Sequence, residues 1–366
     1  MPKTTLSMIR ADVGSYPGHS RTHPKILEKA QKLLKDEEGK LLIDSFVTHC
    51  GDDLELIMTH THGVDNGEVH RLAGDVFQEC AKIARSLKLS GAGQEMHLAA
   101  FSGNVRGSGP AAAEMEFEER ETDPVLVFMA DKTGPGAWNF FLYKIFADPF
   151  NTPGLVTDPL LQKGFIFEVH DLKKARRILF TCPEELYRLL AYIGESSRYV
   201  IRNVVTREGE IATATNAGHR NMKTGSSAGK DDPVMIVRAG GVFPAVGEII
   251  EPFTIPVLVA GWMRGSHHGP FLPVGLCDAN CTRFDGPSRV VCFGFQLCNG
   301  KLIGPADMFE DPAFDRVRSR CNELADIIRA QGPFEPHRIS PEETENTILP
   351  TLDKELSARW EPLPPA

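Results

Sequence analysis

The chain has 366 residues, of which 42% are hydrophobic and 24% charged, as in an ordinary folded globular protein. This length allows one large domain or two closely joined ones. The net charge of −9 argues against binding to nucleic acid, but it does not exclude an anionic substrate, because bound cations can reverse the local field. No apolar run is long enough for a membrane span, and the N-terminus lacks the apolar segment of a signal peptide.

Helices and strands are intermixed along the chain. The periodicity predicts helices over 24–38, 66–88, 183–194 and 311–331, and strands over 41–49, 124–133, 197–206 and 233–239. Pro24 suits the first turn of the first helix. This mixture predicts an α/β or α+β fold without defining the strand order. We expect a catalytic domain over 1–335 and a proline-rich, acidic tail over 336–366 that packs on the surface or on a neighbouring subunit.

The eight cysteines are irregularly scattered, which is typical of reduced thiols in a cytoplasmic protein. Cys277, Cys281, Cys292 and Cys298 fall close together and could be proposed as a zinc site. Their spacing fits none of the common paired zinc patterns, and the last two lie in an apolar, strand-like stretch. We therefore interpret them as buried or incidental thiols.

Two pairs of adjacent aspartates, Asp52-Asp53 in THCGDD and Asp231-Asp232 in GKDDP, are the most unusual feature of the chain. Adjacent carboxylates repel each other, whereas hard divalent cations such as Mg²⁺ tolerate crowded oxygen ligands. Lys230 directly precedes the second pair, so it is either a counter-ion or an amine whose proton affinity the metal ions control. The two pairs indicate multi-metal phosphate chemistry, with Lys230 as a candidate amine nucleophile.

Further side chains with metal-binding groups recur at the ends of predicted elements, beside Gly, Pro or Thr, where a ligand can approach. With the two pairs, they are Asp12, His19, Asp52, Asp53, Gln94, Asp131, Asp231 and Asp232. Each aspartate alone could instead cap a helix or close a turn. As a set, oxygen-rich ligands with one imidazole favour Mg²⁺ or Mn²⁺ over zinc or copper.

Candidate groups for a substrate phosphate lie beside these carboxylates or in glycine-rich strings. Lys132 follows Asp131 at the end of a predicted strand, Asn104 lies in FSGNVRG, and Arg264 lies in GWMRGSHHGP. For Arg264 the alternative is a surface ion pair. Asp12 could accept a proton from the attacking water, whose pKa bound cations would lower.

Long strings of this chain resemble the bifunctional fructose-1,6-bisphosphate aldolase/phosphatase family of archaea and deep-branching bacteria. They include KTTLSMIRADVGSYPGH, THCGDDLELIMTHTHG, FSGNVRGSGP, FMADKTGPGAWN, FADPFNTPGLV, GKDDPVMIVR, GWMRGSHHGP, TRFDGPSR and GPFEPHR. The likeness runs over almost the whole chain and in the same order, which makes a chance match implausible.

This resemblance implies a compact four-layer α-β-β-α sandwich that assembles as a homo-octamer. A single site would join dihydroxyacetone phosphate to glyceraldehyde 3-phosphate through a lysine Schiff base, and would then remove the 1-phosphate with Mg²⁺. The implied Mg²⁺ ligands are the eight residues named above. Asp12 would also be the proton acceptor and Lys230 the Schiff-base lysine. The implied substrate contacts are His19, Gly103, Asn104, Lys132, Arg264 and Asp285.

Several positions depart from the family pattern on the sugar side of the site. Ser227 stands where the family has the acid/base tyrosine of the aldol step, and Asn346 replaces a second tyrosine. Ser90 aligns with a substrate-contacting tyrosine of the family, the pair Gly240-Gly241 aligns with a Gln-His pair, and His268 stands where the family has tyrosine. Since a tyrosine exchanges a proton far more readily than a serine, we expect the aldol step to be about 10²- to 10⁴-fold slower unless another group replaces it.

Three functions follow as hypotheses. The leading one is a Mg²⁺-dependent sugar-bisphosphate phosphatase with fructose 1,6-bisphosphate as default substrate, and with possible Schiff-base aldolase activity. The second is a Schiff-base lyase that acts on a different carbonyl phosphate, because Lys230 is retained in a changed pocket. The third is a non-catalytic metal-binding paralogue, against which the intact carboxylates argue.

Overall fold

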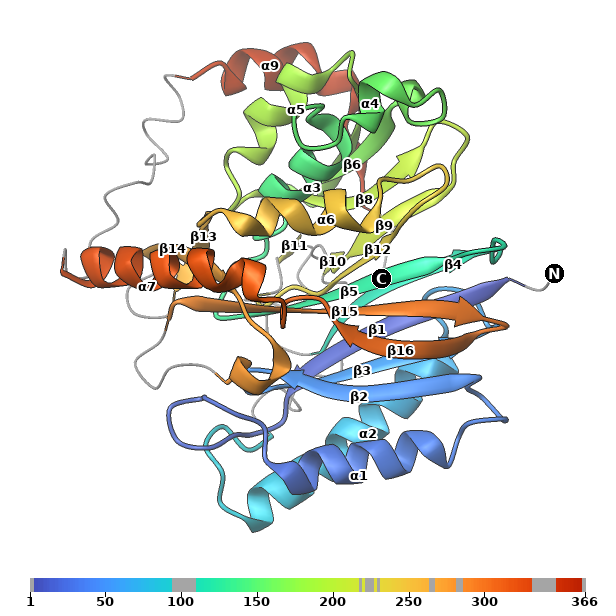
Figure 1. The fold of residues 1–366 in the computed structure, drawn as a ribbon, viewed down its shortest axis with the longest axis vertical. Helices are drawn as coiled ribbons and strands as arrows, with labels where there is room; N and C mark the ends of the chain where they lie inside the picture. The colour runs from blue at the N-terminus through green and yellow to red at the C-terminus, as the bar shows by residue number, and fades with distance from the viewer. Residues whose placement is uncertain are drawn as a thin grey trace.

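The computed structural model describes residues 3–93, 110–216, 219–220, 227–228, 231–262, 267–280, 286–330 and 347–363, with only the backbone at 219–220, 227–228, 262 and 267. These residues form an α+β sandwich of four layers, helix–sheet–sheet–helix, in which two sheets pack face to face (Figure 1). The predicted fold class is therefore confirmed.

The smaller sheet has four antiparallel strands in the order β2-β3-β1-β4. Their bounds are β1 (Thr4–Asp12), β2 (Asp44–Cys50), β3 (Asp53–His60) and β4 (Ala111–Phe117). Helices α1 (Pro24–Lys35) and α2 (Gly67–Ser86) cover its outer face, at the bottom of Figure 1. Pro24 begins α1, as predicted, and His23 caps it by accepting from the Lys25 amide.

The larger sheet has the order β13-β14-β15-β5-β12-β9-β8-β6-β7-β17, and β16 pairs with β15. Among the strand pairs of this sheet that the structure describes, only β14–β15 is parallel. The bounds are β5 (Pro124–Asp131), β6 (Phe165–Asp171), β7 (Arg176–Cys182), β8 (Tyr199–Thr206), β9 (Ile211–Thr215), β12 (Met235–Arg238), β13 (Leu258–Trp262), β14 (His267–Pro273), β15 (Ser288–Cys298), β16 (Lys301–Asp307) and β17 (Glu361–Pro362). Two further short strands, β10 (His219–Arg220) and β11 (Ser227–Ala228), pair with each other in a separate antiparallel ribbon.

The second helical layer lies on the outer side of the larger sheet, mostly in the upper half of Figure 1, with its longest helix at mid-height on the left. It contains α3 (Asn139–Ala147), α4 (Gly154–Thr157), α5 (Leu186–Ile193), α6 (Val246–Ile250), α7 (Asp315–Ala330) and α9 (Leu349–Glu355). In the C-terminal segment, α9 packs on α5, and β17 pairs with β7. None of the described helices combines the length and the apolar character that crossing a lipid bilayer requires.

The position of the core follows from side-chain alternation in β1. Leu6 and Met8 point into the layer between the two sheets, whereas Ile9 and Ala11 point toward α1 and α2. Because the sandwich covers both faces, nearly every residue of β1 is buried. Any polar residue on the inner face must therefore be paired or serve a function.

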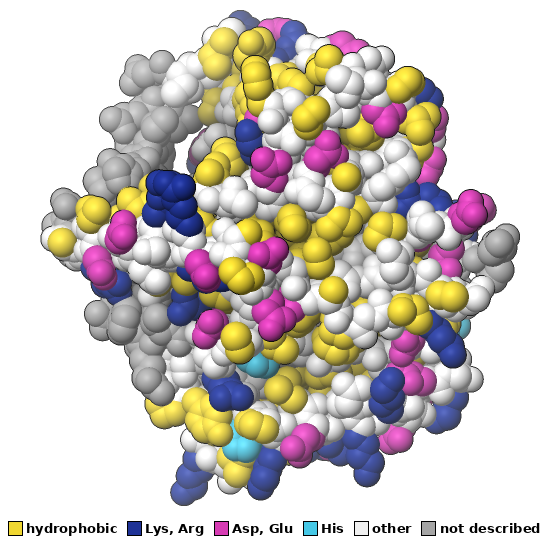
Figure 2. All heavy atoms as spheres, in the orientation of Figure 1, with side chains coloured by type: hydrophobic (Ala, Val, Ile, Leu, Met, Phe, Trp, Pro, Cys, Tyr) yellow, Lys and Arg dark blue, Asp and Glu magenta, His cyan; other side chains and the backbone are white. Residues whose placement is uncertain are grey.

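The surface carries both signs of charge. On the face drawn in Figure 2, acidic and basic side chains lie between one another rather than in separate blocks. The cysteines that the structure describes are unpaired thiols, and Cys292 is buried in β15 whereas Cys277 and Cys298 are exposed. Cys281 lies outside the described residues.

Candidate functional site

The inner face of the smaller sheet changes from apolar to charged toward one end. Along β1 it carries Met8, then Arg10, then Asp12. Antiparallel pairing places Glu55 opposite Arg10 and Asp53 opposite Asp12. The last residue of β5 brings Asp131 to the same end from the larger sheet, next to Gly51. The convergence of these strand ends builds a carboxylate-rich site between the sheets.

One group in this site consists of Asp12, His19 and Asp52, whose candidate ligand atoms lie within 4.8 Å of one another. His19 Nδ1 is 3.0 Å from Asp52 Oδ2 and 3.8 Å from Asp12 Oδ2. The carboxylates of Asp12 and Asp52 raise the pKa of His19 to about 10. Burial alone would raise the pKa of Asp52, but Lys132 and His19 lower it to about 2. Asp52 is therefore a carboxylate stabilised chiefly by the ammonium group of Lys132.

The second group consists of Asp53, Asp131 and Asp232, which also offer one oxygen each within 4.8 Å. Thr133 fixes Asp232 from both sides, because its amide donates to Asp232 Oδ1 at 2.7 Å and its carbonyl accepts from the Asp232 amide at 2.9 Å. Burial and the neighbouring Asp131 raise the pKa of Asp232 to about 8. Burial also raises the pKa of Asp53, although Arg10 opposes this shift. Additional positive charge at this position would favour the ionised form of these crowded carboxylates.

Lys132 lies at the junction of the two groups. Its Nζ donates to Asp52 Oδ1 at 2.6 Å and to Asp131 Oδ1 at 2.9 Å, and its side chain is 5% exposed. Its backbone has a φ of 64°, which turns the chain sharply after β5. The turn points the ammonium group back over the end of its own strand.

Arg10 is the corresponding cation of the second group, and the sequence did not single it out. Its guanidinium donates to Asp53 Oδ1 and to the main-chain oxygen of Asp231. Gly51 is another residue that only the structure identifies. Its φ is 56°, and a Cβ at this position would lie 2.0 Å from Asp131 Oδ2. The close approach of the β2–β3 turn to Asp131 thus requires glycine.

The donor set fits a divalent metal ion. Five carboxylates and one imidazole supply two sets of three candidate ligands, and the buried Asp53 Oδ2 has no hydrogen-bond partner among the described residues. A hard cation would satisfy that oxygen and offset the burial and the carboxylate repulsion that raise the pKa of Asp53 and Asp232. The site therefore contains acidic groups that could hold metal ions.

Eight of the residues predicted from the sequence lie together here: Asp12, His19, Asp52, Asp53, Asp131, Lys132, Asp231 and Asp232. The other six lie outside the described residues: Gln94, Gly103, Asn104, Lys230, Arg264 and Asp285. Asn346 lies outside them as well, and for Ser227 only the backbone is described.

Ser90, the pair Gly240-Gly241 and His268 lie within the described residues, and His268 is in β14, where it pairs with Ala260 of β13. Ser90 exchanges main-chain hydrogen bonds of 2.9 Å with Ser15, whose hydroxyl donates to Asp52 at 3.3 Å, so Ser90 borders the site. Gly240 follows β12 at the opposite end of the larger sheet, where its carbonyl accepts from Arg120. Given about 3.3 Å per residue along a strand, the length of β5 separates these two ends by roughly 20 Å. Gly240 is thus remote from the carboxylates of its own chain.

Asp65, His70 and Glu114 form a third group with candidate ligand atoms within 4.8 Å. Glu114 already accepts from the Asp65 amide at 2.9 Å, from Ser7 Oγ, and from His70, whose Nε2 lies 3.0 Å away. We therefore interpret the group as a structural hydrogen-bond network. Burial alone would raise the pKa of Glu114, but the bonds from His70 and Ser7 lower it to about 2.

This network predicts a pH-dependent contribution to stability. Because the folded-state pKa of Glu114 lies below the ordinary 4.5, its stabilising effect is present above that pH and is lost as the pH falls toward about 2. Glu114→Gln should lower the free energy of unfolding by about 3 kcal/mol at neutral pH and by progressively less below pH about 4. Chemical denaturation across this range measures the difference. Glu116→Gln, which removes only an exposed pair with Lys3, should cost less than about 1 kcal/mol, and an equal loss would contradict the account.

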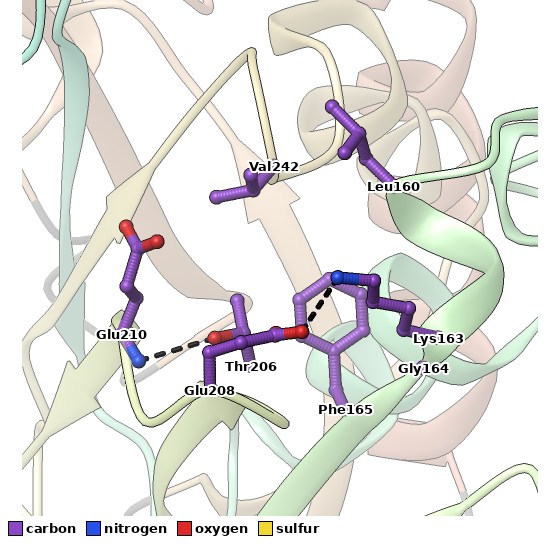
Figure 3. Close-up of a pocket in the computed structure, with 8 residues that line it drawn as sticks. All are labelled: Leu160, Lys163, Gly164, Phe165, Thr206, Glu208, Glu210 and Val242. Carbon is purple, nitrogen blue, oxygen red and sulfur yellow. Dashed lines mark hydrogen bonds and ion pairs between the residues drawn. The ribbon is translucent and has the colours of Figure 1, made fainter.

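A surface pocket lies away from the carboxylates, at the end of the larger sheet where β8 and β9 meet (Figure 3). Lys163 Nζ pairs with Glu208 at 2.6 Å along one wall, and the Glu210 amide donates to Thr206 Oγ1 at 3.1 Å. The lining residues are Leu160, Lys163, Gly164, Phe165, Thr206, Glu208, Glu210 and Val242. No predicted site residue contributes to it.

Comparison with known proteins identifies the family. The fructose-1,6-bisphosphatase family matches residues 3–361. The chain is 55% identical over 362 residues to a fructose-1,6-bisphosphate aldolase/phosphatase of Ignicoccus hospitalis, which covers 99% of this chain and 94% of the relative. It is also 55% identical to that of Moorella thermoacetica, covering 98% and 94%, and 51% identical to that of Methanothermobacter marburgensis, covering 98% and 99%. The chain therefore belongs to the fructose-1,6-bisphosphatase family, which confirms the resemblance seen in its sequence.

Proposed function

We propose that this protein is a Mg²⁺-dependent fructose-1,6-bisphosphate phosphatase that releases fructose 6-phosphate, and that the same site joins dihydroxyacetone phosphate to glyceraldehyde 3-phosphate. The observation that carries the proposal is the convergence of two carboxylate groups on one fixed lysine between the sheets. The names of the relatives and the family match support both activities.

The Mg²⁺ ligands in this proposal are Asp12, His19, Asp52, Asp53, Gln94, Asp131, Asp231 and Asp232. Bound Mg²⁺ would neutralise the charge of the phosphoryl group and lower the pKa of an attacking water. Asp12 is the proton acceptor for that water. Its Oδ1 accepts from the Gly14 amide at 2.8 Å, which orients the carboxylate at the partly open end of β1.

The substrate contacts in this proposal are His19, Gly103, Asn104, Lys132, Arg264 and Asp285. Lys132 presents a buried ammonium group in front of Asp52 and Asp131, and a phosphate oxygen would find there a fixed positive charge. Lys230 directly precedes the anchored Asp231-Asp232 turn, and its amine forms the Schiff base with the ketone in the aldol step.

Two assays on the same preparation test these activities separately. The first follows phosphate release from a panel of sugar bisphosphates with Mg²⁺, and we expect fructose 1,6-bisphosphate to be among the best substrates. The second follows aldol condensation and borohydride trapping of dihydroxyacetone phosphate on Lys230. Trapping without phosphate release would favour the alternative of a lyase acting on another carbonyl phosphate. A preparation that shows neither activity would overturn the proposal.

We also propose that residues 1–335 act as one catalytic domain in a cytoplasmic homo-octamer, as the resemblance implies. Light scattering coupled to size-exclusion chromatography tests the assembly. A mass of about eight chains is expected, and a monomer at all concentrations would contradict it.

A further inference from the structure

Arg10 and Glu55 form a polar layer between the apolar core and the carboxylate site. Both point into the space between the sheets, directly opposite each other in the β1–β3 register. The Arg10 side chain is 1% exposed, and Glu55 is fully buried. Neither belongs to the predicted ligand set. Two buried ionisable side chains at this depth need a reason, because burial disfavours the charged form of each.

The contacts of Arg10 connect two distant parts of the chain. Nη1 donates to Asp53 Oδ1 at the start of β3, and Nη2 donates to the main-chain oxygen of Asp231. Nη2 also lies 3.7 Å from Asp231 Oδ1 and 3.8 Å from Asp232 Oδ2. A planar guanidinium can make these contacts at the same time, whereas the ammonium group of a lysine is a point charge.

Glu55 makes no side-chain hydrogen bond to any residue that the structure describes. Both of its carboxyl oxygens are buried without a hydrogen bond in the described part of the chain. Directly opposite residues of antiparallel strands have Cβ atoms about 5 Å apart, so the guanidinium of Arg10 is the neighbouring cation, and it opposes the rise that burial causes in the pKa of Glu55. Glu55 thus faces Arg10 in the inner layer without taking part in its contacts to Asp53 and Asp231.

We propose that Arg10 is a positioning residue of the metal centre. Its guanidinium fixes Asp53 of the smaller sheet and the Asp231-Asp232 turn beside the larger sheet in one arrangement, with Asp131 between them, and Glu55 retains it there. The inference rests on the proposed function only in that the carboxylates bind a divalent cation. Partners that orient metal ligands typically contribute 10- to 100-fold to metal affinity.

The test is titration of the full-length protein with Mn²⁺ alone by isothermal calorimetry, together with the thermal midpoint of each variant in chelator. Arg10→Met should weaken Mn²⁺ binding about 10- to 100-fold. Arg10→Lys keeps the positive charge but not the paired N–H donors of the guanidinium, and its loss of Mn²⁺ affinity should fall at the lower end of that range. If Arg10→Met does not fold, Arg10→Lys alone decides the question.

Arg238→Met is the matched control for losing a buried arginine. Arg238 is equally enclosed, pairs with Asp123 at 2.8 Å, and lies at the end of the larger sheet remote from Asp131. The Arg238→Met variant should have a lower thermal midpoint, but its Mn²⁺ affinity should stay within about twofold of the wild-type value, because none of the proposed metal ligands lies near Arg238. A purely structural role for Arg10 would give the same result for both arginine variants, and so would overturn the proposal.

Glu55→Gln tests the second half of the inference. It should weaken Mn²⁺ binding in the same direction as Arg10→Met, and the double variant should lose no more than Arg10→Met alone, because both residues act through one guanidinium. Additive losses would show that Glu55 acts independently. If the wild-type protein binds Mn²⁺ and Arg10→Met binds it equally well or more tightly, only this inference fails. If the wild-type protein binds no Mn²⁺, the proposed function fails with it.

Discussion

Asp12→Asn should lower kcat for phosphate release about 10²- to 10⁴-fold, because an amide cannot accept the proton of the attacking water. The asparagine oxygen can still accept from the Gly14 amide, so the end of β1 should keep its conformation. The same change removes a negative charge beside His19 and Asp52, and weaker Mg²⁺ binding is expected as well. Steady-state kinetics at saturating Mg²⁺ separates the loss of the base from the loss of the metal.

Asp44→Asn is the control for this prediction. Asp44 lies at the start of β2, at the far end of the smaller sheet, where it accepts from the amides of Ser45 and Leu302. Its replacement should leave kcat near the wild-type value. An Asp12→Asn enzyme with at least half of the wild-type kcat would show that another group accepts the proton.

Gly51→Ala should remove most of the phosphatase activity without changing any polar side chain. A Cβ would lie 2.0 Å from Asp131 Oδ2 and 2.3 Å from its Cγ, so the carboxylate must move. Displacement of a catalytic group by about 1 Å can cost about 10²-fold in rate. Because Asp131 also accepts from Lys132, both the metal ligand and the phosphate-facing ammonium should shift. Mn²⁺ titration and kcat on the same sample measure both effects.

Gly39→Ala is the control that separates the effect of backbone strain from the effect of the clash between a Cβ at position 51 and Asp131. Gly39 has a φ of 77°, so alanine is strained there as well, but a Cβ would meet no atom within 4 Å. Its cost should be about 1–2 kcal/mol of stability, with unchanged activity. Equal activity losses in the two variants would contradict the role assigned to Gly51, and so would an active Gly51→Ala enzyme.

Elements with strong local signals could be predicted from the sequence. The helix predicted over 24–38 is α1, because proline at its first position and a regular apolar face define it locally. The apolar run over 124–133 is β5, which is buried on both faces. The strand predicted over 41–49 begins later, at Asp44, because Leu42 closes a turn by accepting from the Gly39 amide at 2.8 Å.

Other parts of the fold depend on contacts between distant segments. Strand β3 was not predicted, because its buried residues show no alternation and its acidic start is typical of a loop. The position of β5 between β12 and β15 joins segments far apart in the sequence, and no local pattern contains that information. The layered order came from the family resemblance.

The same distinction applies to the site. Paired aspartates at the ends of elements are visible in the sequence because adjacent like charges are unusual, and the structure brings Asp52, Asp53 and Asp232 close together. In the sequence, Arg10 and Glu55 resemble the ordinary polar positions of a strand that has one solvent-exposed face. Only the second sheet, which covers that face, shows that they are buried. Residues that support a site through burial are therefore the hardest to predict.

Anomalous diffraction from crystals grown with Mn²⁺ is the most direct test of a two-group metal centre between the sheets. The account predicts two strong anomalous peaks, one coordinated by Asp12, His19 and Asp52 and the other by Asp53, Asp131 and Asp232. Lys132 should lie between them. Crystals that bind Mn²⁺ only elsewhere, or that leave both carboxylate groups without a peak at saturating metal, would contradict it.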